Sequence, residues 1–241
     1  MASQYFANFP EIQYEFANGQ FATVKDLFRK ARIDSSTIDS IINYTYYECQ
    51  EGDRPDVVAS RLYNDPDVYW TFFLVNDFLG SINDWWKDSR TFEAFIKTKY
   101  PGFAVNATNT TDIVSRTSKF ALGEHCTFSG GAKGRICEVN PTMKRVIVVY
   151  DNIARGSASE TLTGDISNKS FTVVSTTENR DAVHHYLETN GTWSNVNNDS
   201  NTAVSNIEYE RDVNEEKRKI KVIEPRYIQR IVREFEDIIS I

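Results

Sequence analysis

Cysteine, histidine and long apolar runs are all scarce in this sequence. Its 241 residues include three cysteines and three histidines, and Cys49, Cys126 and Cys137 are widely spaced. None of them forms the Cys-x-x-Cys pair that zinc ribbons and redox sites use. We therefore expect reduced thiols, no metal site and no cofactor.

The few potential metal ligands do not complete a site in the sequence. His125 next to Cys126, with Cys137 beyond, offers three ligands, but a fourth is not evident. A residue pair on the strand of a small barrel is the simpler interpretation. His184-His185 could be proposed as acid-base or metal residues, yet no cysteine, serine or acid constellation surrounds them. We predict a solvated polar helix or loop there.

Membrane spans, secretion signals and basic surfaces are also missing. No run approaches the roughly 18 apolar residues of a membrane span, and the N-terminus lacks the order of a secretion signal. We expect a soluble protein made in a cytoplasm. Lys and Arg number 27 against 34 Asp and Glu, which gives a net charge of −7. This balance argues against the broad phosphate-binding surface that duplex DNA demands, so we expect neither nucleic acid nor membrane as partner.

The composition indicates several small cores instead of one large core. Hydrophobic residues make up 40% of the chain, and the mean hydropathy is −0.47. Polar connectors rich in Asn, Ser and Thr occupy residues 105–118 and 194–206. The expected pieces are an aromatic N-terminal arm with a short helix (1–45), a module with a following helix (46–104), a small β-barrel (119–178) and a C-terminal strand and helix (207–241).

Residues 46–77 carry the clearest local signals. A short strand is followed by Asp53, which we expect to cap a helix whose first turn contains Pro55. The turn Asn64-Asp65-Pro66 ends this helix and starts a second one, which is apolar over much of its circumference. A further helix is predicted near residues 91–100.

These residues resemble a known module. They are similar to a LysM-type strand-helix-helix-strand domain at the following motif positions: Gly52, Asp53, Pro55, Ala59, Tyr63, Pro66, Trp70 and Asn76. The fuller pattern, with Trp85 downstream, resembles the LysM-like baseplate wedge subunit of T-even-like contractile-tailed phages. The segment Tyr5–Tyr14 is similar to the N-terminal segment of that family, and the stretch from Arg218 to Ile239 to its closing strand and helix.

The resemblance implies a structural role in the virion. It suggests a tail baseplate component, assembled in the host cytoplasm and present in several copies per particle. Such a component would bind other baseplate wedge, hub and sheath-proximal tail proteins and join wedges around the hub. No catalytic residues are expected.

Both ends of the chain carry more apolar groups than a small module needs. Aromatic residues fill the N-terminal arm, including Phe16 and Phe21, and a short helix is predicted around Val24–Ala31. The arm either wraps over the module or docks into another subunit, and the C-terminal helix either packs onto the module or lies in a partner's groove. The residues we predict at protein interfaces are Tyr5, Phe6, Phe9, Tyr14, Ile228, Ile231, Phe235 and Ile238.

Short strands with glycine turns in the middle of the chain predict a small barrel. They include Cys126–Phe128, Arg135–Val139 and Arg145–Tyr150, and their order resembles SH3-like barrels. Gly130, Gly131 and Gly134 could suggest a phosphate cradle, but no Gly-Lys-Ser/Thr ending follows, so we predict a hairpin turn. The expected fold is therefore α+β: a LysM-like module, an SH3-like β-barrel insertion and a C-terminal strand-helix.

Two other functions remain open from the sequence. A LysM-type module that binds glycan (peptidoglycan) is the main alternative, although Arg54-Pro55 stands where ordinary LysM domains usually show Thr or Ser followed by an apolar residue. A wall-degrading hydrolase is the other. It would normally need a substantial catalytic domain beside the module, and the chain leaves no space for one.

Overall fold

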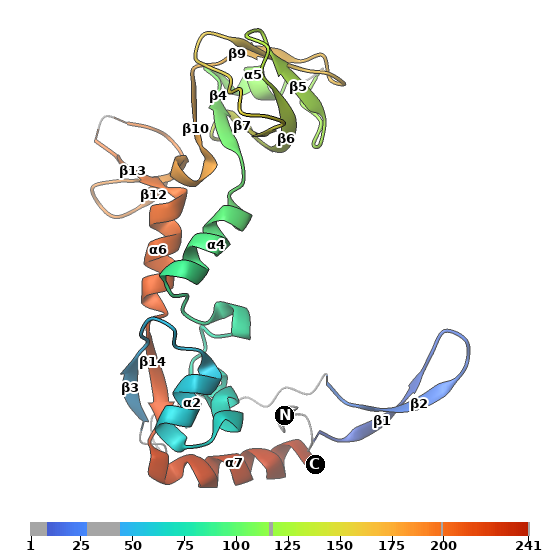
Figure 1. Ribbon diagram of the computed structural model, residues 1–241, viewed down its shortest axis with the longest axis vertical. Helices are drawn as coiled ribbons and strands as arrows, with labels where there is room; N and C mark the ends of the chain where they lie inside the picture. The colour runs from blue at the N-terminus through green and yellow to red at the C-terminus, as the bar shows by residue number, and fades with distance from the viewer. Residues whose placement is uncertain (1–8, 28–43, 116–117, 199, 241) are drawn as a thin grey trace. The chain divides into compact units, whose positions relative to one another are not determined.

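The computed structural model describes residues 9–27, 44–115, 118–198 and 200–240, which form a mixed α+β protein (Figure 1). The chain divides into two compact units. The first unit contains residues 1–89 and 214–241, and the second contains residues 90–213.

A strand-helix-helix-strand arrangement forms the centre of the first unit. Its strands β3 and β14 pair antiparallel, with Tyr44 opposite Ile223 and Glu48 opposite Lys219. The C-terminal strand expected from the sequence is thus the partner of β3. The elements of this unit, in chain order, are β3 (Tyr44–Glu48), α2 (Pro55–Tyr63), the 3-10 helix η2 (Pro66–Tyr69), α3 (Trp70–Val75), η3 (Ile82–Asp84), β14 (Lys219–Ile223) and α7 (Pro225–Ser240).

Proline and aspartate set the starts of two helices in the first unit. α2 begins at Pro55, but its N-cap is Arg54, which makes no side-chain capping bond. The prediction that Asp53 caps α2 is wrong, because its carboxylate is engaged by β3 and by the turn before the helix. The second start is confirmed, since Asp65 accepts a hydrogen bond from the Asp67 amide at 2.9 Å at the N-cap of η2.

The core of the first unit is built by α2, α3, β14 and α7. Its fully buried side chains include Val58, Ala59, Phe72, Ile220 and Ile223. The apolar stripe of α7 adds Ile228 and Ile231 to this core, and Phe235 and Ile239 form a neighbouring cluster with Phe9. Packing of the C-terminal helix onto the N-terminal module, one of the two interpretations above, is therefore confirmed.

A two-stranded hairpin lies near the N-terminus (Figure 1). β1 (Glu11–Glu15) and β2 (Phe21–Lys25) pair antiparallel along their whole length. Asn18-Gly19 lies in the turn, where Gly19 has a φ of +75° that suits glycine. The prediction of a helix from Val24 is wrong for Val24 and Lys25, because the β-branched residues of β2 continue the strand. Residues 28–31 lie outside the described part of the chain.

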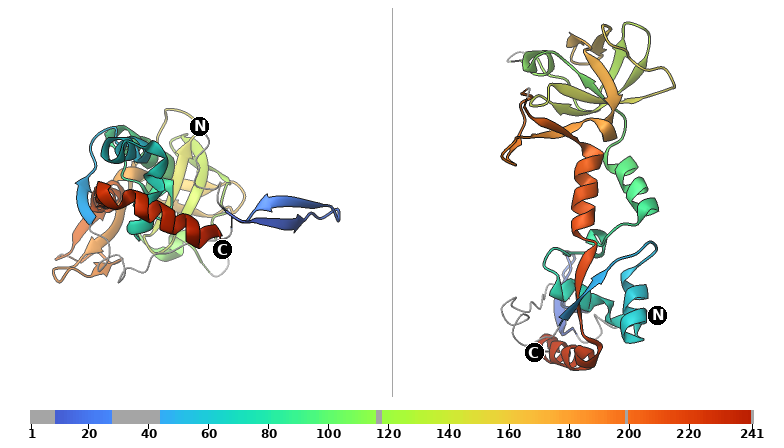
Figure 2. Two further views of the ribbon diagram at one scale, coloured as in Figure 1. Left: turned by 90° about the horizontal axis from the view of Figure 1, so that it is seen from below. Right: turned by 90° about the vertical axis from the view of Figure 1, so that its left-hand side faces the viewer.

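A seven-stranded antiparallel sheet makes up most of the second unit, in the order β10-β4-β7-β6-β5-β8-β9 (Figure 2). Its strands are β4 (Phe103–Asn106), β5 (His125–Phe128), β6 (Lys133–Asn140), β7 (Arg145–Tyr150), β8 (Thr161–Gly164), β9 (Ser170–Thr172) and β10 (Ser175–Glu178). β4 lies before the range 119–178 expected for the barrel. Both faces of β4 are covered, with Val105 in the barrel core and Ala104 against Ala182. Apolar and polar residues therefore do not alternate along this strand.

The sheet curls so that both of its edges come from one chain segment. Only Val173 and Val174 separate β9 from β10, and their amides donate to the carbonyl oxygens of Glu160 and Asn106, each at 2.8 Å. The barrel interior is filled by the following side chains, among others: Phe128, Ile136, Val148, Leu162 and Phe171. The short helix α5 (Thr110–Ile113) covers this core with the buried Ile113.

A three-stranded sheet and two helices complete the second unit. The sheet has the order β12-β11-β13. Glu210 accepts hydrogen bonds from the Lys99 ammonium and the Tyr100 hydroxyl, both at 2.7 Å, and so ties α6 to the end of α4. The elements are α4 (Ser89–Lys99), η4 (Asn179–Asp181), β11 (Val183–Leu187), β12 (Trp193–Ser194), β13 (Thr202–Ser205) and α6 (Asn206–Glu216). α4 confirms the helix predicted near residues 91–100.

Candidate functional site

Asp53 is the centre of a polar network at the turn between β3 and α2. Its buried carboxylate accepts hydrogen bonds from the Tyr47 hydroxyl at 2.6 Å and the Gln50 amide at 2.9 Å. It also forms an ion pair with Arg61 at 3.0 Å. Burial alone would raise the pKa of Asp53, but these partners outweigh burial and lower it. The preceding Gly52 has a φ of +81°, which the turn requires.

This network fixes the turn. The Trp85 indole N–H donates to the Asp53 carbonyl oxygen at 2.8 Å, so the turn is held on a second side. Burial, and then the neighbouring Asp53, raise the pKa of Tyr47 to about 12. Asp53 is therefore ionised and Tyr47 protonated at neutral pH, and the two side chains are hydrogen-bonded to each other.

Two further motif residues connect the helices to β14. The Tyr63 hydroxyl donates to the Ile223 carbonyl oxygen at 2.8 Å. The buried Asn76 side chain donates to the carbonyl oxygen of Lys221 and accepts from the amide of the same residue, both at 2.8 Å. These bonds attach α2 and α3 to a strand that is distant in the sequence.

The remaining motif residues have structural positions. Ala59 and Pro55 are buried on α2, whereas Pro66 is exposed at the first position of η2. Trp70 packs against Phe235 of α7, with ring centroids 4.3 Å apart. These motif residues thus assemble one fold.

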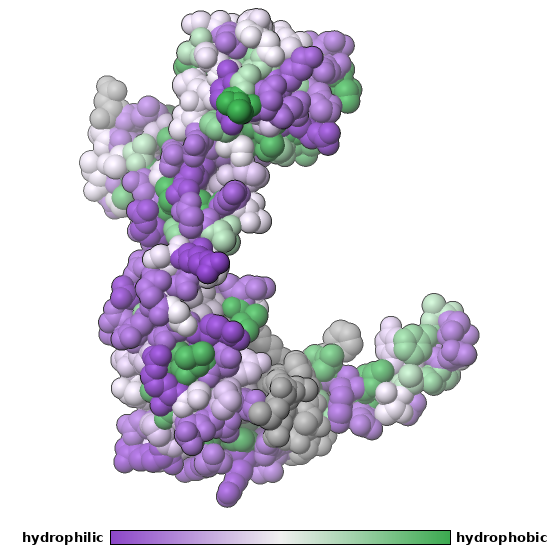
Figure 3. All heavy atoms as spheres, in the orientation of Figure 1, coloured by the Kyte–Doolittle hydropathy of each residue, from purple (hydrophilic) through white to green (hydrophobic). Residues whose placement is uncertain are grey.

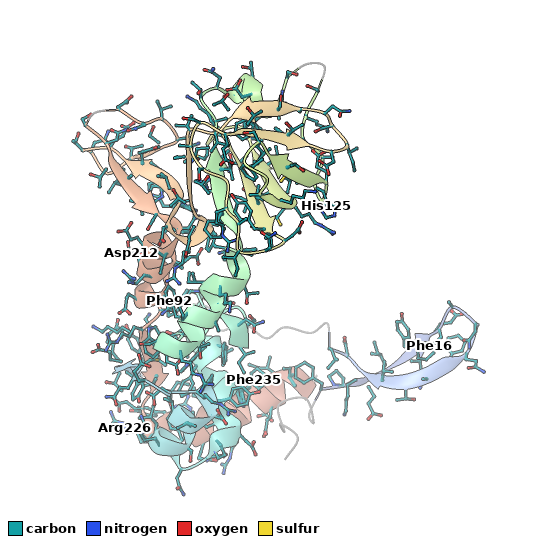
Figure 4. The ribbon with its side chains drawn as sticks, turned by 45° about the horizontal axis from the view of Figure 1, so that its top comes forward. Phe16, Phe92, His125, Asp212, Arg226 and Phe235 are labelled. Atoms are coloured by element: carbon teal, nitrogen blue, oxygen red, sulfur yellow. The ribbon has the colours of Figure 1, made fainter. Side chains whose placement is uncertain are left out.

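The eight predicted interface residues fall into three groups. Tyr5 and Phe6 lie outside the described residues. Four side chains are buried within the first unit: Phe9, Ile228, Ile231 and Phe235, the last of which is labelled in Figure 4. Tyr14 and Ile238 are 48% and 60% exposed.

The β1–β2 hairpin has one apolar face. The pairing sets Ile12 opposite Val24 and Tyr14 opposite Ala22 on this face. Tyr14 contacts Phe16 of the turn edge to face, with centroids 5.3 Å apart. We call these five residues the hairpin apolar face. Figure 3 shows hydrophobic spheres at the surface of this hairpin, and Figure 4 labels Phe16 on it.

The opposite face of the hairpin is polar. Glu11 and Lys25 form an ion pair at 3.4 Å, and the Gln13 amide donates to the Thr23 hydroxyl at 2.8 Å. Phe21, 65% exposed, lies on this face opposite Glu15. Phe16 and Phe21 are aromatic residues of the N-terminal arm that are not among the eight predicted interface residues. The sequence feature that predicts this hairpin is the turn dipeptide Asn18-Gly19 between two stretches in which apolar and polar residues largely alternate.

The two adjacent histidines are packed, so the prediction of a solvated helix or loop is wrong. His184-His185 lies in β11, whose alternation turns the two rings to different neighbours. His184 stacks on Tyr209 and His185 on Trp193, with centroids 4.0 and 4.2 Å apart. Their Nδ1 atoms are 2.9 Å apart, and burial lowers the pKa of both. For His184, the charge of His185 lowers the pKa further.

In the barrel, Cys126 and the glycines have structural positions, whereas Cys137 is exposed. His125 is exposed whereas Cys126 is buried, because adjacent strand residues point to opposite faces, and the strand-pair interpretation is confirmed. Burial raises the pKa of Cys126 to about 12. The hairpin turn is also confirmed, since Gly131 has a φ of +92° between the paired strands β5 and β6. Within the described ranges, no three His, Cys, Asp or Glu side chains are grouped to hold a metal.

The comparison with known families supports one of the functions left open by the sequence. Residues 4–111 match the protein family described as base plate wedge protein 53. Over this stretch, which is under half of the chain, the sequence is similar to that family. No curated protein matches the chain. The match confirms the resemblance to a baseplate wedge subunit and supports a structural role in the virion tail, in assembly with other baseplate proteins.

The wedge-family match has a defined place in the fold. It spans the hairpin, β3, α2, α3, α4 and β4, but it ends before β14 and α7, which complete the first unit. None of the helices in the described ranges combines the length and the apolar character that a membrane span needs.

Proposed function

We propose that this chain is a non-catalytic baseplate component that binds neighbouring wedge proteins and joins wedges around the hub. The observation that carries the proposal is the hairpin apolar face. Several copies per particle would act together with hub and sheath-proximal proteins, after assembly in the host cytoplasm.

The hairpin is an unusual place for uncovered aromatic groups. A two-stranded hairpin is marginally stable alone in water, and burying a large apolar side chain is worth about 2 to 3 kcal/mol. Tyr14 and Phe16 are 48% and 46% exposed side by side, and the main-chain edges of β1 and β2 pair only with each other among the described residues. A partner that covers this face would stabilise the hairpin and gain the burial of both rings.

The chemistry of the hairpin favours a protein surface as occupant. One face is apolar, and the other carries acids, a lysine and Gln13 beside the exposed ring of Phe21. Apart from Phe21, this is the amphipathic pattern of an element that lies on an apolar groove and keeps its other face in water. The wedge-family match covers the hairpin, so the partner that we propose is another wedge protein. Ile238, exposed on α7, is a second candidate contact.

A reconstitution with defined components tests this proposal. Purified wedge proteins are mixed with the full chain, and complexes are followed by size-exclusion chromatography with light scattering. We expect the double variant Tyr14→Ser and Phe16→Ser to lose at least about tenfold in affinity, which is about 1.4 kcal/mol. The matched control is Ile153→Ser, since Ile153 is 92% exposed but lies in the second unit.

The outcome that contradicts the proposal is also clear. If the unmodified chain remains a monomer with every wedge, hub and sheath-proximal protein, the assembly function is wrong. If the hairpin variant binds as well as the control, the hairpin is not the contact.

A further inference from the structure

A cleft of about 680 Å³ opens in the second unit, beside the barrel strands β4, β7 and β10. Hydroxyl, amide and charged groups gather in it. The lining residues that matter here are Asn106, Lys144, Arg145, Ser175, Asp181 and Tyr186. The wedge-family match ends at residue 111, so most of this lining lies outside it.

Arg145 is a buried arginine without an acidic partner. The residue is only 7% exposed, and its Nη1 donates to the Val183 carbonyl oxygen at 2.7 Å. Its Nε has no hydrogen-bond partner among the described residues. A guanidinium withdrawn from water in this way is costly unless another group satisfies it. Burial lowers the pKa of Arg145, against the opposing charge of Glu138.

The engaged and the unengaged sides of this guanidinium differ. The bond to Val183 uses Nη1, so the edge formed by Nε and Nη2 makes no hydrogen bond within the described ranges. Two parallel N–H groups on one edge of a guanidinium match the two oxygens of a carboxylate. Arg145 therefore keeps guanidinium donors that a carboxylate can pair with, although the Nε–H itself is enclosed by the protein.

The charges around the cleft favour a ligand with a single negative charge. Lys144 is exposed beside Arg145, with a left-handed φ of +54°, and its carbonyl oxygen accepts from the Ala107 amide at 2.7 Å. Asp181 is the acid among the lining residues. Two lining cations stand against one lining acid, and Glu138 opposes Arg145 from outside the lining, so at most one positive charge is left, which a carboxylate balances and a phosphate dianion exceeds.

We propose that this cleft binds a carboxylate presented by an acidic side chain of a neighbouring protein, with Arg145 as its anchor. The volume exceeds that of a lone carboxylate, so flanking residues of the partner would enter with it. The identification of the partner as a baseplate protein rests on the proposed function. Carboxylate binding by the isolated chain does not rest on it, so either statement can fail while the other holds.

The side-chain Nε–Hε signal of Arg145 in 15N-labelled full-length protein provides the test. It is assigned by its disappearance in Arg145→Lys and followed while acetate, inorganic phosphate or an acetylated Asp-Glu peptide replaces chloride at constant ionic strength. We expect a saturable shift with acetate, and half-saturation at an at least about tenfold lower concentration with the peptide.

Two variants distinguish specific binding by Arg145 from general electrostatic attraction by surface cations. Lys144→Gln, at an exposed position, should keep the fold and weaken peptide binding a few-fold. Arg135→Lys, an exposed arginine of β6 that contacts His125, is the matched control and should leave binding unchanged. If Arg145→Lys does not fold, the titration of the unmodified protein still decides.

Three results would overturn the inference. One is an Arg145 signal that stays unchanged in all anions up to about 100 mM, where a site with a millimolar Kd would be almost full. Another is a response to phosphate without a response to acetate. The third is a peptide that binds no better than acetate, which rules out the protein partner.

Discussion

Single buried polar groups connect parts of this chain that are far apart in the sequence. Glu124 is 2% exposed, and its carboxylate accepts from the amides of Ala121, Ile166 and Ser167 at 2.7 to 3.0 Å. Burial opposes its ionisation, but these bonds outweigh burial and lower the pKa of Glu124. Glu124 thus connects two turns of the barrel, in the same way that Asn76 connects α3 to β14 in the first unit.

The histidine pair in β11 should make the second unit sensitive to mild acid. Burial lowers the pKa of His184 and His185 in the fold, so near pH 6.5 the unfolded chain takes up protons that the folded chain does not. The free energy of unfolding is therefore highest above the pKa that these histidines have in the unfolded chain. It decreases as the pH falls from there toward their lower pKa values in the folded protein. Glu210 opposes this shift for His184, whereas Lys99 and Arg145 add to it.

Urea unfolding of the full chain between pH 7.5 and 5.5, followed by Trp193 fluorescence, measures this loss. The variant His184→Phe with His185→Phe should remove most of the pH dependence in this range. His125→Phe, exposed on β5, is the control and should keep it. An unchanged slope in the double variant would contradict the explanation, because carboxylates such as Glu124 titrate at lower pH.

Residue-level predictions succeeded where a signal was local. Asp65 caps η2 as predicted, because the cap and the amide that it accepts from are two residues apart. Asp53 shows the same local signal, but Tyr47 and Arg61 compete for its carboxylate, and their approach depends on the tertiary fold. That Arg145 is buried with an unsatisfied Nε cannot be read from the sequence, since both its burial and its hydrogen bonds depend on the tertiary fold.

At the scale of elements, α7 combines a buried stripe and an exposed edge. Ile231 is 6% exposed in the core, whereas Ile238 is 60% exposed on the same helix. Ile231→Ala should therefore cost about 2 to 5 kcal/mol in free energy of unfolding. Ile238→Ala, the matched control, should cost less than about 0.5 kcal/mol. Chemical unfolding followed by tryptophan fluorescence measures both, and equal costs would mean that the stripe is not the packed face.

Element types could be predicted where the periodicity was strong. α4, α7 and the barrel strands β6 and β7 follow from their apolar spacing. The N-terminal hairpin was missed because rings on both faces hide the alternation, and α6 was missed because its sequence is largely charged and polar. α6 is held by tertiary contacts such as those of Glu210 with Lys99 and Tyr100, which a local pattern does not contain.

At the scale of the whole molecule, the wedge-family match does not coincide with a folding unit. A fragment of residues 1–111 lacks β14 and α7, so β3 has no partner strand and the core of the first unit is open. We expect this fragment to be unfolded or aggregated. A chain that joins residues 1–89 to 214–241 by a short Gly-Ser linker should fold, because Lys87 and Asn214 exchange two hydrogen bonds of 2.9 Å.

Amide NMR spectra of the two fragments distinguish these outcomes. Dispersed signals from residues 1–111 alone, or collapsed signals from the linked chain, would show that the first unit is not organised by β14. Residues 90–213 expressed alone serve as the comparison, since their barrel strands all pair within that range.

The distant pairing of β3 with β14 also sets an order of events during translation. β3 leaves the ribosome early but waits for its partner until residue 223 has been made, while every strand of the barrel has already emerged. The inserted unit can mature on the nascent chain, and the segment around it closes last. Limited proteolysis of ribosome-stalled chains that end near residue 213 should find the barrel protected and α2 still cleavable.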